Sequence, residues 1–188
     1  MSLPDLKIAT FNVWHGLAGR GVVRFREFEE PERREERFAT CIRTLREVNP
    51  DILLLQELNP VSLRGDLIRS ALGGVFLGRA DQTGIKLFAR GYPANLSTGL
   101  GLLIRGHARV CDDTAAKKVP THLRLSGELG FSGETWSFHL DEQRYAQLLS
   151  VEHAGLGRLL IVNVHLHHGF ERFSPLMKLL ETARAENK

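Results

Sequence analysis

The chain has 188 residues, enough for one ordinary domain and too few for two. Hydrophobic residues make up 43% and charged residues 25%, a globular composition that excludes a chain disordered throughout. A formal charge of +3 is only mildly basic, so composition does not indicate a dedicated nucleic-acid-binding surface.

Apolar runs in the sequence are strand-sized and far shorter than the roughly 20 residues that cross a bilayer, so no membrane span is expected. The N-terminus has no basic segment followed by a long apolar core, which argues against a secretory signal. With only Cys41 and Cys111, no disulfide framework is expected. Together these features predict a cytoplasmic protein.

The first part of the chain reads as strand, helix, strand. Leu6 to Val13 alternates in a way that predicts a strand with most positions able to be buried. After a loop from Gly16 to Phe28, Pro31 suits the first turn of a helix that ends at Asn49 to Asp51. Ile52 to Leu55 follows as an apolar strand, so the two strands should share one sheet. The apolar stripe of the helix consists of Phe38, Cys41, Ile42, Leu45 and Val48.

A second helix is expected at Val61 to Leu72, because Gly73 and Gly74 follow it. Val75 to Leu77 is expected to be a short strand, and Gly78 to Ser97 a loop-rich region.

From Thr98 onward the pattern changes to strands with short gaps, which predicts an antiparallel meander. Gly155 and Gly157 lie in the expected hairpin turn between the last two strands. Glu171 to Glu186 has the apolar stripe of a terminal helix. The expected strands are 98–106, Arg109 to Cys111, Lys118 to Leu125, Trp136 to Leu140, Ala146 to Glu152 and Leu159 to His165.

Polar side chains follow three of these strands. Asn12 ends the first strand, Gln56 and Glu57 follow "ILLL", and His165 follows "IVNV". Strand ends present functional groups on a rigid backbone. A carboxylate there suits Mg²⁺, an amide can orient it, and a histidine can donate to a phosphoryl oxygen or act as acid or base.

Four segments, in order, resemble the motifs of the endonuclease/exonuclease/phosphatase family. They are "LKIATFNVWHG", "NPDILLLQE", "STGLGLLIRG" and "RLLIVNVHL". The resemblance implies a four-layer α/β sandwich, of mixed α+β class, formed by one domain over residues 1–188. It also implies hydrolysis of a phosphoester by Mg²⁺-assisted attack of water, with Mn²⁺ as an alternative ion.

Roles carry over by position. Glu57 matches the family's metal-binding glutamate, and Gln56 matches the residue that usually precedes it and supports it without binding the metal. Asn12 matches the asparagine that helps to arrange metal and phosphate. His165 matches the histidine that contacts the scissile phosphate in several members. The resemblance therefore implies Glu57 and Asn12 at the metal, and His165 and Asn12 as catalytic residues.

The resemblance covers about the first two-thirds of a family domain. The "GDFN"-like and "SDH"-like motifs, which position the nucleophile and complete the site, are missing, and no D-x-N occurs in the sequence. Without those segments a sheet edge would stay open. We therefore expect a truncated or split product, a partial gene model, or a half-domain that needs a partner supplying the rest.

Two other interpretations remain. One is a non-catalytic remnant that keeps the first part of the fold. The other is a histidine-based zinc hydrolase that uses His165 with His167 and His168, although Gly169 stands where a known H-x-H-x-D-H motif has aspartate. The sequence does not choose among nucleic acid, phospholipid and sugar phosphate as the phosphoester substrate.

Overall fold

The computed structural model describes residues 5–14, 30–80, 84–87, 90–91, 99–111, 122–124, 130–132, 136–139, 145–165, 177–178 and 180–181. Two long helices and the strands of three sheets lie within these residues. The helices are α1 (Pro31–Val48) and α2 (Val61–Leu72). The strands are β1 (Ile8–Asn12), β2 (Ile52–Leu58), β3 (Val75–Ala80), β4 (Gly84–Leu87), β5 (Arg90–Gly91), β6 (Gly99–Ile104), β7 (Ala108–Val110), β8 (His122–Arg124), β9 (Gly130–Ser132), β10 (Trp136–His139), β11 (Tyr145–His153) and β12 (Gly157–Val164).

The first sheet has the strand order β1-β2-β6-β3. β1 and β2 are parallel, with Asn12 beside Gln56, which confirms the expected strand-helix-strand unit. All six residues of β6 are buried, because this strand lies between β2 and β3 and is covered on both faces.

The second sheet is built on the hairpin of β11 and β12, which confirms the turn expected at Gly155 and Gly157. Gly157 has φ +74, a conformation that glycine adopts without steric cost. β7 and β8 both pair with β11. β4, β5, β9 and β10 form a third, small sheet.

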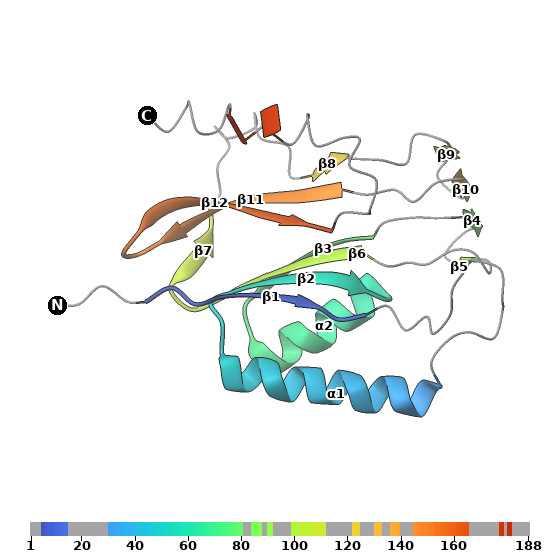
Figure 1. Ribbon diagram of the computed structural model, residues 1–188, viewed down its shortest axis with the longest axis horizontal. Helices are drawn as coiled ribbons and strands as arrows, with labels where there is room; N and C mark the ends of the chain where they lie inside the picture. The colour runs from blue at the N-terminus through green and yellow to red at the C-terminus, as the bar shows by residue number, and fades with distance from the viewer. Residues whose placement is uncertain are drawn as a thin grey trace.

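The described part of the molecule is layered, as Figure 1 shows. α1 and α2 cover one face of the first sheet, and the second sheet covers the other. Alternate residues of β2 enter the two resulting cores: Leu53 and Leu55 face the helices, whereas Ile52 and Leu54 face the second sheet. Leu180, from a helical segment, packs on the outer face of the second sheet. The fold is the mixed α+β, four-layer sandwich that the resemblance implies.

The helix boundaries agree with those expected from the sequence, because the local signals at the helix ends are strong. Pro31 occupies the first turn of α1, and Asn49 ends it with φ +50 while its N–H donates to the carbonyl of Leu45 at 2.9 Å. Gly73 ends α2 with φ +76. No helix in the described ranges is long and apolar enough to span a membrane.

Three expectations need correction. β1 is not mostly buried, because it lies at the edge of its sheet and Ile8 is 52% exposed. The later strands do not form one meander: β6 joins the first sheet, where its apolar side chains are buried on both faces, while β7 and β8 pair with β11. The region Gly78 to Ser97 contains the end of β3 as well as β4 and β5.

Two further expectations fall largely on residues outside the described ranges. The loop from Gly16 to Phe28 lies wholly outside them. Of the terminal helix expected at Glu171 to Glu186, only 177–178 and 180–181 are described, and these are helical.

Candidate active site

β1, β2 and β12 end on the same side of the sandwich (Figure 1). The polar residues at or just after these strand ends lie close together. The Asn12 side-chain Nδ2 donates to Glu57 Oε1 at 2.7 Å. His165 Nε2 lies 3.5 Å from the same Oε1 atom. Three segments that are distant in the sequence therefore converge on one carboxylate oxygen.

A β-bulge presents Glu57 to this cluster. Leu55 pairs with Gly101 and Leu58 with Gly99, so two residues of β2 lie opposite one residue of β6. Glu57 itself has φ +57, which is uncommon for a residue with a side chain. Bulges and left-handed backbone of this kind often turn a side chain toward a functional site. The Glu57 side chain is 15% exposed and that of His165 is 26% exposed, so both are partly shielded but accessible.

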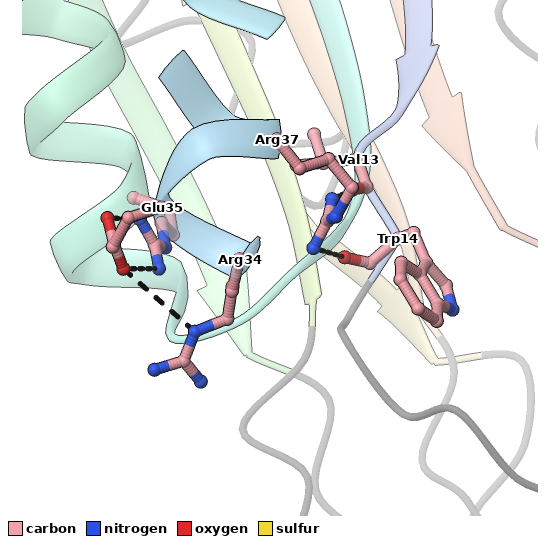
Figure 2. A network of polar contacts seen from close by, with 6 residues as sticks. Val13, Trp14, Arg34, Glu35 and Arg37 are labelled. Atoms are coloured by element: carbon pink, nitrogen blue, oxygen red, sulfur yellow. Dashed lines mark hydrogen bonds and ion pairs between the residues drawn. The ribbon is translucent and has the colours of Figure 1, made fainter. Parts of the chain in front are cut away.

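The backbone after β1 holds the Asn12 side chain in place. Trp14 N donates to Asn12 Oδ1 at 2.9 Å, which leaves Nδ2 free to donate to Glu57. Arg37 of α1 donates to the carbonyls of Val13 and Trp14, and its guanidinium lies 4.8 Å from the centroid of the Trp14 ring (Figure 2). These contacts tie α1 to the end of β1, and so to Asn12.

Gln56 points away from the cluster into the space between the two sheets, where it is 9% exposed. Its Nε2 donates to Thr10 Oγ1 at 3.1 Å and to Asn163 Oδ1 at 2.8 Å. Asn163 Nδ2 in turn donates to the carbonyls of Leu55 and Gly101, each at 3.0 Å. Gln56, the residue before Glu57, is thus fixed by hydrogen bonds to side chains of both sheets.

The donor set around Glu57 fits a hard cation. Mg²⁺ takes one or two protein carboxylates and completes its shell with water and substrate oxygens. Glu57 supplies one accessible carboxylate, and Asn12 and His165 can orient it. Within the described residues no group of three or more His, Cys, Asp or Glu side chains gathers for a metal. His167 and His168, on which the zinc interpretation depends, lie outside those residues.

A groove of about 580 Å³ runs beside the cluster between β1 and α1. Phe11, Asn12 and Trp14 line one side, and Arg37 and Cys41 line the other. Burial raises the pKa of the Cys41 thiol to about 11, so this cysteine is a protonated part of the core and a poor nucleophile at neutral pH. This agrees with its place in the apolar stripe of α1.

Two contributors to the site are not apparent from the motifs. Asn163 is 1% exposed, and the signal for it is a single amide inside the otherwise apolar stretch "LLIVNV". Arg37 lies among many charged residues of α1, where nothing in the sequence distinguishes it from a solvated neighbour.

No protein-family model and no curated protein matches the sequence. Solved structures do match. A mannosyl-6-phosphatase from Bacteroides thetaiotaomicron has a TM-score of 0.56 at 16% identity, over 97% of this chain and 62% of that one. An endonuclease/exonuclease/phosphatase from Bacteroides vulgatus has a TM-score of 0.50 at 16% identity, over 87% and 53%.

A humanized D. rerio TDP2 with 14 mutations also matches, with a TM-score of 0.52 at 14% identity over 95% of this chain and 54% of that one. The chain thus spans between about half and three-fifths of the length of these structures. At identities this low, the comparison shows similarity of fold alone. The described part of the chain has an endonuclease/exonuclease/phosphatase-like fold.

Proposed function

We propose that the chain is the part of a Mg²⁺-dependent phosphoester hydrolase that holds the metal-binding carboxylate. One observation carries this proposal: the ends of β1, β2 and β12 bring Asn12 and His165 to the same carboxylate oxygen of Glu57. The fold shared with phosphatase structures is consistent with it. A purely structural carboxylate would not need a bulge with left-handed backbone to bring it to an accessible edge.

Each residue has a distinct task in this proposal. Glu57 holds Mg²⁺, or Mn²⁺ in its place. Asn12 orients that carboxylate through Nδ2, because its Oδ1 already accepts from Trp14 N. His165 donates a hydrogen bond to a phosphoryl oxygen as negative charge builds on it. Bound Mg²⁺ supplies Lewis-acid stabilisation of the phosphoryl oxygens.

The proposal includes a further polypeptide segment on the free edge of β1. In the described residues β1 pairs on one side only, with β2, and Ile8 and Thr10 are exposed. The groove between β1 and α1 lies along this edge and has the apolar side chains of Phe11 and Val13 in its wall. An added strand would satisfy the edge and cover the groove. The motifs missing from the sequence would come from the same segment.

Hydrolysis of bis-p-nitrophenyl phosphate with Mg²⁺ tests the proposal. The chain is assayed alone and after co-expression with a polypeptide that carries the "GDFN"-like and "SDH"-like motifs. Glu57→Gln and His165→Gln are expected to lower kcat at least a hundredfold in whichever form is active, as removal of charge-stabilising groups does. Glu152→Gln, an exposed carboxylate near the hairpin turn at the other end of β11, serves as the matched control and should be unchanged.

The outcomes separate the interpretations. Equal rates in the Glu57→Gln variant and the parent chain would sink the proposed site. A chain that is inactive both alone and with the added polypeptide, yet folds cooperatively, would support the non-catalytic remnant. Activity that returns only with Zn²⁺ and survives Glu57→Gln would support the zinc hydrolase. A panel of DNA, RNA, a phospholipid and a sugar phosphate then identifies the substrate class. The name of the Bacteroides thetaiotaomicron mannosyl-6-phosphatase makes a sugar phosphate the first to try.

A further inference from the structure

We propose that Asn163 is a positioning residue for this site: its buried carboxamide maintains the bulge that presents Glu57 and ties His165 to it. This inference rests on the proposed function, because it concerns how the same cluster is held together. Asn163 touches neither Glu57 nor His165 through any contact described above. It acts through the backbone on which both of them stand.

The Asn163 side chain contacts β2 and β6 at their last regularly paired residues before the bulge. Leu55 and Gly101 are register partners there, and the regular pairing breaks immediately after them. Asn163 Nδ2 donates to both of their carbonyls, each at 3.0 Å, and its Oδ1 accepts from Gln56 Nε2 at 2.8 Å. One side chain therefore bonds to both strands of the interrupted ladder and to the residue just before Glu57.

These bonds matter because the Asn163 side chain is buried. Asn163 is 1% exposed, so water cannot replace a lost hydrogen bond without entering the space between the sheets. Loss of the carboxamide would leave two carbonyls and the Gln56 amide short of a partner. Without these bonds the second sheet no longer holds the two strands at the register shift, so the bulge can relax and Glu57 can leave its left-handed conformation.

The same residue also locates His165. Asn163 lies in β12, and His165 follows directly after Val164, the last residue of that strand. In extended backbone, residues two positions apart point to the same side. The hydrogen bonds of Asn163 hold this end of β12 against β2 and β6. Asn163 therefore helps to set the 3.5 Å distance between His165 Nε2 and Glu57 Oε1.

Gln147 provides a control that separates positioning from ordinary core stability. It is also 1% exposed and also crosses between the sheets, where its Nε2 donates to the carbonyl of Leu77 at 2.9 Å. That contact is on β3, at the far side of the first sheet from Glu57. Gln147 Oε1 lies 3.5 Å from Asn163 Nδ2, so the two belong to one network but serve different strands.

The test compares Asn163→Leu with Gln147→Leu by NMR of the Asn12 side-chain amide, with urea unfolding to measure the stability of each variant. Glu57→Gln defines where the Asn12 amide signal moves when its charged acceptor is lost. We expect Asn163→Leu to shift that signal toward the Glu57→Gln position and Gln147→Leu to leave it near its parent position. If Asn163→Leu does not fold, Asn163→Ser is used, since its hydroxyl can donate only one of the two bonds. An unmoved Asn12 signal in the Asn163 variant, or an equal shift in both variants, overturns the inference.

Kinetics on bis-p-nitrophenyl phosphate, in the form of the protein that is active, give the second readout. A displacement near 1 Å at the reacting groups lowers rate by about a hundredfold, so Asn163→Leu should lose that much kcat with KM little changed. Gln147→Leu should lose much less kcat than Asn163→Leu, because it leaves both Asn163 bonds to the bulge in place. Parent-like kcat in Asn163→Leu overturns the inference while the proposed function stands. An inactive parent with the expected Asn12 shift overturns the proposed function while the positioning role stands.

Discussion

The contact between Glu35 and Arg64 joins the two helices that support the first sheet, and its loss should destabilise the fold measurably. Glu35 Oε2 accepts from Arg64 Nη1 at 2.9 Å, and Glu35 Oε1 accepts from Arg64 Nη2 at 2.6 Å. The Arg64 guanidinium lies over the Phe38 ring, 4.4 Å from its centroid. Figure 2 shows the Glu35 end of this network beside Arg34. We expect Glu35→Ala to weaken the packing of α1 on α2.

The expected loss of unfolding free energy lies between two limits, one set by the buried Arg64 and the other by the exposed Glu35. The Arg64 side chain is only 4% exposed, and an unpaired buried charge costs about 3–5 kcal/mol. The Glu35 side chain is 59% exposed, however, and exposed ion pairs contribute only about 0–1 kcal/mol because water screens them. Water can also approach Arg64 from the side that Glu35 leaves. We therefore expect Glu35→Ala to lower the free energy of unfolding by about 1–2 kcal/mol, between these limits.

Urea unfolding as a function of pH checks this value. The hydrogen bond with Arg64 holds the pKa of Glu35 below its ordinary value of 4.5. A depressed pKa in the folded state means that the stabilisation is fully present above the unfolded-state pKa and is lost as the pH falls through the folded-state pKa. The difference between the parent and Glu35→Ala should thus be largest near neutral pH and shrink below pH 4.5.

Glu36→Gln is the matched control, because Glu36 is the exposed neighbour of Glu35 on the same helix. It should change the free energy of unfolding by no more than about 0.5 kcal/mol. If Glu35→Ala unfolds at the same midpoint as the parent at pH 7, the bidentate contact does not stabilise the fold and the reasoning is wrong. A difference that grows toward acid pH would contradict the assigned sign.

Two further predictions concern the core. Gly65→Ala in α2 should destabilise the chain by about 1 kcal/mol, since overpacking costs about 1–3 kcal/mol and outweighs the gain of about 1 kcal/mol in helix propensity. A Cβ atom at Gly65 would lie 2.0 Å from Phe76 Cε1, and the ring has little room to move because Gly78 and Gly101 also border it. Thermal unfolding measures the loss, and Ser70→Ala at an exposed position of α2 is the control. Cys41, whose pKa is raised to about 11, should resist iodoacetamide in the native chain at pH 8 and react after denaturation, as mass spectrometry would show. Rapid native labelling would mean that α1 opens at this position.

The first half of the fold was predictable because its signals are local. Pro31 and Asn49 mark the ends of α1, and the apolar run at Ile52 leaves little choice but a buried strand. The second half was predicted less well, because pairing between strands is set by which faces must be buried. The residues 98–106 carry no signal that β6 lies between β2 and β3 and that it does not pair with β7. Edge position likewise depends on neighbours, which is why the exposure of Ile8 was missed.

The candidate site divides in the same way. Asn12, Glu57 and His165 could be named from their places at strand ends, and the structure brings all three together. The bulge at Glu57 was not predictable, because it depends on the register between β2 and β6. The support from Asn163 was also hidden, since a lone asparagine in an apolar strand has no local property that indicates contacts more than 60 residues away in the sequence.

Binding of Mn²⁺ tests the central claim most directly, because it asks whether Glu57 holds a metal without requiring a complete catalytic site. Electron paramagnetic resonance of Mn²⁺ reports the bound fraction in the parent, in Glu57→Gln and in Glu152→Gln. The account predicts saturable binding to the parent and to Glu152→Gln, and an affinity at least about tenfold weaker in Glu57→Gln. Equal Mn²⁺ affinity in all three proteins would show that the carboxylate shared by Asn12 and His165 is not a metal ligand.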